Sequence, residues 1–274
     1  MVRAGEPSQT AYGAARLRAL HQSLDGGRIF SDPLAERILG PETSPDEADL
    51  SARERLRLFV AVRHRFAEDA LAAAVERGTR QVVVLGAGFD TFAYRNPYPG
   101  TRVFEVDLAA SGAWKRDRLT QAGIEIPSSV AFVGIDFETD DLLERLAAAG
   151  FDAGSPAFFL WLGVVPYLTR DAVVATLRAV ATVPGGEVAF DYTNPLGTGG
   201  AAPRHQLELR TRVAGVGEPF TEGLATDDLH ATLHDLGFTE VDDLGRREIR
   251  VRYLGRPPGG SDGDTHLLRA LRSP

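Results

Sequence analysis

The chain of 274 residues has no cysteine, no methionine beyond Met1 and a single lysine, Lys115. Without cysteine it has no disulfide, thiolate nucleophile, iron–sulfur cluster or zinc site with cysteine ligands. Because no glycine-rich loop precedes Lys115, a Walker-type phosphate loop is also excluded, and one residue is left for Schiff-base chemistry. The chemistry of this protein must therefore come from other side chains.

The sequence also lacks an excess of basic residues and any long apolar run. Its 30 basic residues stand against 38 acidic ones, a net charge of −8, and the arginines are scattered among acids, so we expect no binding to nucleic acid. The longest apolar stretch, Ala157–Leu162 with Gly163–Val165 behind it, is far shorter than the ~20 residues of a membrane span. Residues 1–9 are polar and lack the apolar core of a secretory signal, so we expect a cytoplasmic protein without membrane partners.

Two segments with different patterns follow one another. Residues 1–80 carry apolar residues at helical spacing, most clearly in Thr10–Leu24 and Leu50–Arg77, and are predicted to form an N-terminal helical cap or lid. Residues 81–274 alternate short apolar runs with helical segments, which is typical of a parallel sheet covered on both faces. The first five strands are expected at Val82–Leu85, Thr101–Asp107, Val130–Ile135, Ala157–Leu162 and Glu187–Tyr192.

The chain changes character after the fifth expected strand. Residues 194–221 are rich in Gly and Pro and contain a helical piece near His205–Val213, so we expect an insertion that lies over the sheet. A helix is predicted over Thr226–Leu236, with Thr226 as its N-cap. Two further strands, Phe238–Leu244 and His266–Arg272, are expected on either side of a polar loop.

A glycine-containing turn follows the first expected strand. Gly86 and Gly88 would let the backbone approach a ligand closely, and the helix expected next would offer its amide groups. Asp107 ends the second expected strand, at the distance along the chain where a carboxylate accepts the hydroxyls of a ribose. Glu105 lies on the same face of that strand and is the alternative ribose partner.

The identity of this ligand depends on the third position of the glycine pattern. That position is Thr91 instead of Gly or Ala, which disfavours close passage of a pyrophosphate and therefore NAD or FAD. An adenosine ligand without phosphates fits better, and S-adenosylmethionine is the common one. Asp136 and Phe137 end the third strand, where they are predicted to accept the adenine amine and cover the base. The alternative for this pair is an exposed turn acid beside a core ring.

Motifs from nearly the whole chain are shared with one family. They are Thr10–Arg16, Phe30–Ala35, Arg63–Asp69, Val83–Arg95, Phe104–Asp107, Asp136–Phe137, Trp161–Thr169 and Arg252–Leu254. In them the chain resembles the leucine carboxyl methyltransferase family, most closely its bacterial branch of S-adenosylmethionine-dependent methyltransferases. The resemblance implies the α/β class I methyltransferase fold, a Rossmann-like, mostly parallel sheet of seven strands whose last strand is antiparallel, with helices on both faces. An N-terminal helical cap and an insertion after strand five would complete it.

The resemblance also implies roles for individual residues. Arg63 would pair with the methionine carboxylate of the cofactor, because a guanidinium offers the flat pair of donors that a carboxylate needs. Tyr167 would face the substrate. This chain has Leu162 where many members have Glu, which leaves backbone contacts from Leu162 and Gly163. The expected cofactor-binding residues are Arg63, Gly86, Ala87, Gly88, Glu105, Asp107, Leu108, Asp136, Phe137, Leu162 and Gly163.

The chemistry of the methyl acceptor is inferred from the absence of an obvious general base. A carboxylate nucleophile is already ionised at pH 7 and needs no base, whereas a hydroxyl usually needs one. Outside the cofactor acids no recognised motif supplies a base, which favours a carboxylate. Tyr12, Arg16 and His205 are candidates to line the acceptor pocket or its lid.

No metal site is expected. His230 and His234 are four residues apart on a predicted helix, a spacing that can chelate a metal, but Ala231 stands where a zinc protease has Glu. We interpret them as surface histidines. Asp90, in the glycine turn, is expected to fix the turn and not to perform chemistry.

The leading hypothesis is therefore an S-adenosylmethionine-dependent O-methyltransferase that yields S-adenosylhomocysteine. Its acceptor would be a carboxylate, or a hydroxyl, of a small molecule or peptide, within specialised metabolism. One alternative is a nucleotide-dependent oxidoreductase with the same type of sheet, which Thr91 disfavours. Another is a non-catalytic protein that binds S-adenosylmethionine, motivated by Leu162.

Overall fold

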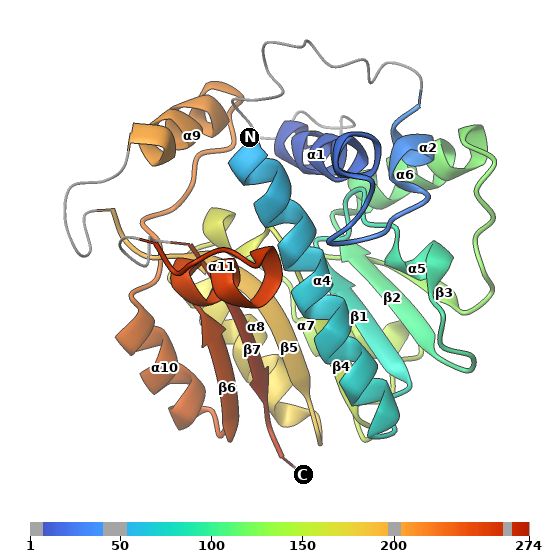
Figure 1. Ribbon diagram of the computed structural model, residues 1–274. Coiled ribbons are helices and arrows are strands. Elements are labelled where there is room, and N and C mark those ends of the chain that lie inside the picture. The colour runs from blue at the N-terminus through green and yellow to red at the C-terminus, as the bar shows by residue number, and fades with distance from the viewer. Residues whose placement is uncertain (1–7, 41–53, 197–203, 260–264, 274) are drawn as a thin grey trace.

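The computed structural model describes residues 8–40, 54–196, 204–259 and 265–273. They form a seven-stranded sheet with helices on both faces (Figure 1). The strand order is β3-β2-β1-β4-β5-β7-β6, and β7 runs in the opposite direction to the other six strands. The strands are β1 (Gln81–Leu85), β2 (Arg102–Asp107), β3 (Val130–Gly134), β4 (Ala157–Trp161), β5 (Glu187–Thr193), β6 (Glu240–Leu244) and β7 (Thr265–Leu271).

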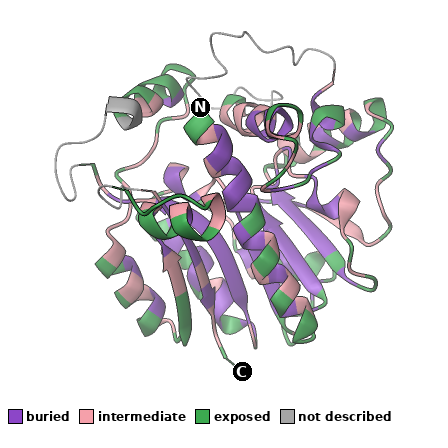
Figure 2. Cartoon of the chain, viewed as in Figure 1, coloured by how far each residue is buried: buried purple, intermediate pink, exposed green. Residues whose placement is uncertain are grey.

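The central strands are continuous apolar runs because the sheet is covered on both faces. Every residue of β1 and β4 is buried, and Val83 of β1 lies between Phe104 of β2 and Phe159 of β4. These central strands are purple, that is buried, in Figure 2. Because β1 to β5 run the same way, their carboxyl ends meet at one edge, where ligands of open α/β sheets bind.

The two faces of the sheet are covered by different helices. One apolar core joins the sheet to α7 (Leu142–Ala148), α8 (Arg170–Thr182) and α10 (Thr226–Asp235). The opposite core joins it to α4 (Glu54–Glu76), the short α5 (Phe92–Arg95) and α11 (Arg246–Leu254). A further helix, α6 (Ala109–Gln121), packs on β2 and β3.

The expected cap of residues 1–80 divides into two parts in the structure. The helix α4 belongs to the core, because Val62, Phe66 and Leu71 share one apolar cluster with β1, β4 and β5. Only α1 (Gln9–Asp25) and α2 (Ala35–Leu39) pack together over the carboxyl edge, against α6 and the glycine turn. Above the same edge lies α9 (Arg204–Gly215), from the expected insertion (Figure 1). The caps are therefore α1, α2 and α9, and the boundary expected at residue 80 does not separate α4 from the sheet.

Two local expectations are wrong. Thr226 is the first residue of α10 and not its N-cap; the cap is Ala225, without a capping side chain, and the Thr226 amide donates instead to Asn194 Oδ1 at 3.0 Å. The segment between β6 and β7 contains α11, where a polar loop was expected. Its pattern was hidden because the helix is rich in arginine and buries only Ile249 fully.

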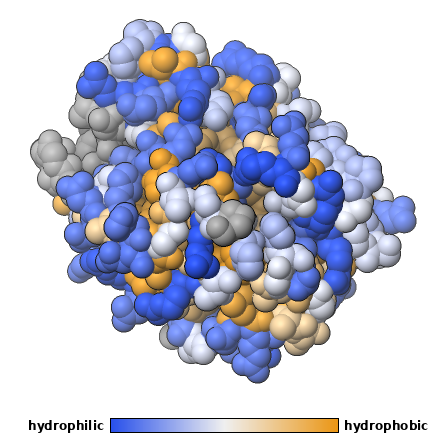
Figure 3. All heavy atoms as spheres, turned by 90° about the horizontal axis from the view of Figure 1, so that it is seen from below, coloured by the Kyte–Doolittle hydropathy of each residue, from blue (hydrophilic) through white to orange (hydrophobic). Residues whose placement is uncertain are grey.

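The face at the amino ends of the parallel strands is mostly hydrophilic, with apolar residues scattered among the polar ones (Figure 3). Within the described part of the chain, no helix combines the length and apolarity that crossing a membrane would require.

Candidate functional site

A cavity of about 1210 Å³ lies at the carboxyl ends of the parallel strands, between the sheet and the caps. It exceeds the ~300–1,000 Å³ typical of a pocket for one small ligand. Its walls include the glycine turn after β1, the ends of β2, β4 and β5, and parts of α1, α4, α9 and α11. The volume is large enough for two small ligands side by side.

The glycine turn has the conformation that close approach of a ligand needs. Gly86 and Gly88 have φ values of 65° and 36°, a left-handed region that favours glycine, and a Cβ on Gly86 would lie 2.3 Å from Val164. Ala87 also lines the cavity. The helix expected after the turn is only the four-residue α5. The amides of Gly86 and Ala87 donate to the Val106 carbonyl and that of Gly88 to Asp107, so these three amides are engaged within the protein.

Asp90 holds this turn in place, as expected. Its Oδ1 accepts the Phe92 amide at 2.7 Å, and its Oδ2 lies 3.5 Å from His64 of α4. Burial acts to raise the pKa of the Asp90 carboxyl, but the hydrogen bond with His64 and nearby positive charges hold that pKa well below its usual range. The turn is also tied to the cap, since Arg18 of α1 donates to the Phe89 carbonyl at 2.6 Å.

Asp107 is oriented towards the cavity by two backbone amides. Gly88 N donates to its Oδ2 and Leu108 N to its Oδ1, both at 2.7 Å. A carboxylate has about four lone-pair positions, so each oxygen keeps one for a ligand. Glu105 is placed elsewhere: it is buried outside this cavity, where Lys115 donates to it at 2.8 Å and the Tyr94 hydroxyl at 2.7 Å. The geometry thus leaves Asp107, and not Glu105, facing the cavity.

The third strand is followed, after Ile135, by a polar and an aromatic residue, both of which line the cavity. Asp136 is exposed, and Phe137 is half-buried with its ring 6.4 Å from that of Trp161. Leu108, 42% exposed, lines the same end of the cavity from the start of α6. An acid beside two apolar side chains suits a flat, polar-edged ring such as a purine.

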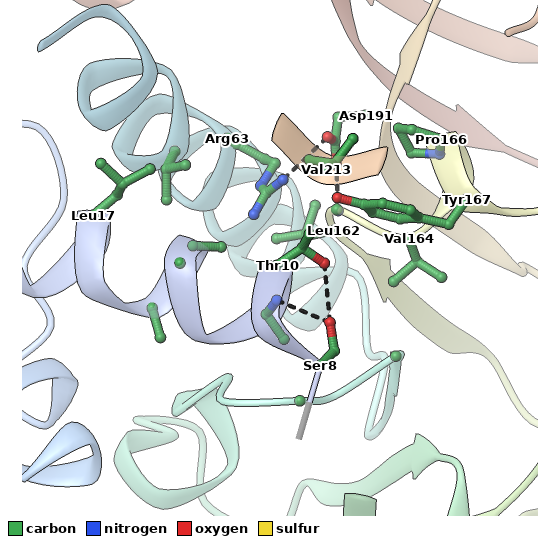
Figure 4. A pocket seen from close by; sticks show the side chains of 18 of the residues that line it. Ser8, Thr10, Leu17, Arg63, Leu162, Val164, Pro166, Tyr167, Asp191 and Val213 are labelled. Carbon is green, nitrogen blue, oxygen red and sulfur yellow. Dashed lines mark hydrogen bonds and ion pairs between the residues drawn. The ribbon is translucent and has the colours of Figure 1, made fainter. Parts of the chain in front are cut away.

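Arg63 reaches the cavity from α4 and is held by an acid that the sequence analysis did not single out. Its Nη1 donates to Asp191 Oδ2 at 3.1 Å, and Asp191 Oδ1 accepts the Gly163 amide at 2.6 Å (Figure 4). Arg63 Nε is buried without a hydrogen-bond partner in the described structure. Gly163 must be glycine, because its φ is 73° and a Cβ would lie 2.7 Å from Arg63 Nη1. Asp191 had a signal in the sequence, an acid near the end of a buried parallel strand.

Leu162 and Tyr167 also line the cavity, from the segment after β4 (Figure 4). Leu162 lies beside Asp191, because Trp161 pairs with Phe190 in the register of β4 and β5. A carboxylate therefore stands one strand away from the position where many family members have Glu. Tyr167 is in the 3₁₀ helix η1 (Val165–Tyr167), and burial raises the pKa of its hydroxyl to about 12, against the hydrogen bond with Thr10.

Of the three residues expected in the acceptor pocket or lid, the two on α1 do not line the cavity. Tyr12 and Arg16 are half-buried on α1 but do not line the cavity, and Tyr12 packs edge-on against Phe89 at 5.8 Å. The cavity face of α1 carries Thr10, Ala14 and Leu17 instead. His205 is in the first turn of α9, and its side chain lies outside the described part of the structure.

The paired histidines of α10 have separate surroundings. His230 Nε2 lies 2.7 Å from Asp243 Oδ2, while the side chain of His234 is 89% exposed. Among the described residues, no group of three or more His, Cys, Asp or Glu side chains is arranged to hold a metal ion.

Comparison with known sequences gives one family. The family model described as leucine carboxyl methyltransferase matches residues 11–181. A Frankia alni protein, named as an S-adenosyl-L-methionine-dependent methyltransferase, is 38% identical over 285 residues, which cover 98% of this chain and 96% of that protein. A Streptomyces coelicolor protein of the same name is 40% identical over 277 residues, with 96% and 94% covered.

Comparison with solved structures gives the same fold. A DUF574 family protein of Streptomyces avermitilis is similar with a TM-score of 0.63 at 17% identity, over 98% of this chain and 99% of that one. An O-methyltransferase family protein of Burkholderia thailandensis has a TM-score of 0.50 at 16% identity, over 96% and 72%. The seven-stranded sheet is that of the class I methyltransferases. With a family model over more than half of its length and a relative 38% identical over nearly all of it, the chain belongs to the leucine carboxyl methyltransferase family.

Proposed function

We propose that this methyltransferase transfers the methyl group of S-adenosylmethionine to an oxygen of a small-molecule or peptide acceptor in specialised metabolism, a carboxylate before a hydroxyl. The observation that carries the proposal is Arg63. Its guanidinium is fixed by Asp191 on one side, while its buried Nε has no partner in the described structure. A buried donor without a partner costs free energy, so a ligand carboxylate is the group that fits there.

The residues around Arg63 fit the rest of the same ligand. Gly86 and Gly88 leave room for the methionine portion, the free lone pairs of Asp107 suit the ribose, and Asp136 with Phe137 and Leu108 suits the adenine. When bound, the cofactor supplies an electrophilic methyl group on a sulfonium. The chain's own contribution is to hold donor and acceptor in line and to exclude water, which the caps over the cavity favour.

The titratable groups at the cavity support a carboxylate acceptor. His64 is the histidine that lines its described part, and burial lowers the pKa of this imidazole, whose Nδ1 bonds the Val60 carbonyl at 2.8 Å. Asp191 is engaged by Arg63 and Gly163. Tyr167, with a pKa of about 12, stays protonated at neutral pH and suits a hydrogen-bond donor better than a base. An acceptor that is already ionised needs none of these groups as a base.

The experiment combines binding and transfer. Calorimetric titration with S-adenosylhomocysteine should give one site per chain, and NADPH should give no binding, which separates methyl transfer from the oxidoreductase alternative. Transfer of a labelled methyl group is then measured over a panel of carboxylic acids, phenols and alcohols. Transfer to an acid supports the proposal, and transfer to hydroxyls alone would refute the carboxylate preference. Tight binding without transfer to any acceptor would favour the non-catalytic alternative.

A further inference from the structure

The half of the cavity away from the cofactor residues carries a concentration of arginines. The expected cofactor residues stand over β3, β2, β1 and β4, whereas the remaining walls lie towards β5, β7 and β6. The lining residues of those walls, from the first turn of α4, α9, α11 and the segment after it, include five arginines and a single glutamate, Glu208. These arginines are Arg55, Arg212, Arg246, Arg250 and Arg256.

These segments meet although they are far apart in the sequence. Arg256, just beyond α11, lies 3.4 Å from Glu54 at the start of α4, and the rings of Phe66 and Tyr253 are 6.5 Å apart. Ile249 of α11 is part of the apolar core that contains α4. On α11, Arg246, Ile249 and Arg250 have the spacing of one helix face, and that face lines the cavity.

Some of these charges are already used within the protein. Arg256 pairs with Glu54, Arg250 donates to the Pro257 carbonyl at 2.9 Å, and Glu208 has an interaction of its own. Arg55, Arg212 and Arg246 differ, because no described acceptor lies within hydrogen-bond or ion-pair distance of them. Of these three, Arg246 is half-buried, and Arg55 and Arg212 are exposed.

The position of Arg246 on its helix also favours an anion beside it. It lies in the first turn of α11, whose N-cap, Gly245, offers no capping side chain. A helix N-terminus carries partial positive charge, so a cation there is favoured by an anion beside it; the acid of this turn, Glu248, is exposed and does not line the cavity. Between the arginines the wall is apolar, with Leu56, Phe59 and Leu254.

We propose that this wall, hereafter the arginine wall (Arg55, Arg212 and Arg246), binds an anionic group of the acceptor that is distinct from the oxygen to be methylated. The acceptor is then an amphipathic acid, with an apolar body against Leu56, Phe59 and Leu254 and a second anionic group at its outer end. That the bound anion belongs to a methyl acceptor rests on the proposed function, whereas the anion site itself is inferred from the residues of the cavity alone.

The test uses two probes that differ by one sulfonate group, the anionic 1-anilinonaphthalene-8-sulfonate and the uncharged N-phenyl-1-naphthylamine. Fluorescence titration of the full chain, with and without S-adenosylhomocysteine, should show the sulfonate bound roughly tenfold tighter, with the preference falling in high salt. The variants R246Q and R55Q should each reduce sulfonate affinity several-fold and leave the uncharged probe unchanged. R247Q is the matched control, because Arg247 is the exposed neighbour that does not line the cavity.

The outcomes separate the two proposals. Equal affinity for both probes in the wild-type chain, or an R246Q variant that behaves like R247Q, would overturn the arginine wall. An R246Q variant that binds neither probe nor S-adenosylhomocysteine has lost its fold. In that case the sulfonate affinity of R55Q, a variant on a different helix, tests the arginine wall. If S-adenosylhomocysteine does not bind to the wild-type chain while the sulfonate preference is present, the proposed function fails and the anion site stands.

Discussion

At the scale of single residues, the end of the cavity near Arg63 depends on two contacts of Asp191 and on the backbone of Gly163. Asp191 accepts the Gly163 amide and the Arg63 guanidinium, and the φ of Gly163 leaves room for that guanidinium. The side chain of Arg63 is thereby fixed before a ligand arrives, which reduces the entropy lost on binding. The charge of Arg63 is balanced by an acid of the protein, yet its Nε remains for a ligand.

Replacing Arg63 by Gln should weaken binding of S-adenosylhomocysteine by roughly 10- to 100-fold, because a hydrogen bond to a charged group contributes about 1.5–3 kcal/mol. Calorimetric titration measures this change. Arg65→Gln is the matched control on the same helix, since Arg65 is exposed and pairs only with Asp69 on the next turn. Equal affinities in the two variants would contradict the assignment of Arg63.

At the scale of elements, the caps are joined by one carboxylate. Glu218, just after α9, accepts the amides of Gln9 at 2.9 Å and Thr10 at 3.2 Å, together with the hydroxyls of Ser8 and Thr10. An acid at a helix N-terminus is stabilised by the free amides and by the helix dipole. The contact closes the cavity on the side of Tyr167, since Thr10 is also a hydrogen-bond partner of that hydroxyl.

Changing Glu218 to Gln should loosen the first turn of α1. Loss of a cap costs about 0.5–2 kcal/mol, so the Gln9 and Thr10 amides should exchange with solvent roughly ten times faster. Hydrogen exchange followed by mass spectrometry or NMR measures this rate. Glu222→Gln is the control, because Glu222 is exposed on the same loop and lines no part of the cavity. Unchanged exchange in the Glu218 variant would show that the contact between Glu218 and the first turn of α1 is not formed in solution.

A second element-scale contact fixes the antiparallel edge of the sheet. Asp243 of β6 accepts from Tyr192 of β5 at 2.7 Å and lies 2.9 Å from His266 of β7 and 2.7 Å from His230 of α10. Burial acts to raise the pKa of the Asp243 carboxyl, but the hydrogen bonds from His266 and Tyr192 outweigh it and the pKa is lowered. The network joins three strands and a helix at one point.

Asp243→Asn should therefore lower the free energy of unfolding at pH 7 by about 1–3 kcal/mol, because buried partners lose their acceptor. A carboxyl with a folded pKa below its unfolded value contributes stability above that unfolded value, near pH 4, and loses it as the pH falls further. The difference between variant and wild type should thus shrink towards pH 3. Urea unfolding followed by circular dichroism at pH 7, 5 and 3 tests both statements. Asp242→Asn, which removes only an exposed pair with Arg252, should change stability by less than about 1 kcal/mol.

At the scale of the whole molecule, the cavity is walled by the caps and the core together, so a ligand that fills it should stabilise both. Binding to the folded state alone adds about 2.7 kcal/mol at a hundredfold excess over Kd. S-adenosylhomocysteine at that concentration should raise Tm by roughly 5–10 °C in a single calorimetric transition. Separate transitions for caps and sheet, or no shift in a protein that binds the ligand by titration, would contradict this arrangement.

The sequence alone predicts the features that depend on a periodic pattern of apolar residues or on a short motif. Buried parallel strands must be apolar on both faces, so their runs were recognisable, and Gly86, Gly88 and Asp107 follow strands at positions where ligands bind. Its resemblance to one family also indicated the antiparallel last strand, which the structure contains, and Arg63, which lines the cavity. The helix α11 escaped because one fully buried residue in nine leaves no apolar stripe.

What the sequence determined by itself is the order of the seven strands, a mostly parallel α/β sheet and the turn at which a cofactor would lie, because each depends on patterns local in the chain. Its resemblance to one family added the class I methyltransferase fold. Only the tertiary structure decided that Asp191 holds Arg63, that Glu105 turns to Lys115, that α4 belongs to the core and that arginines of α4, α9 and α11 face one cavity. The physical reason is distance along the chain: Arg63 and Asp191 are 128 residues apart, and no local pattern records which side chains a sheet will bring together.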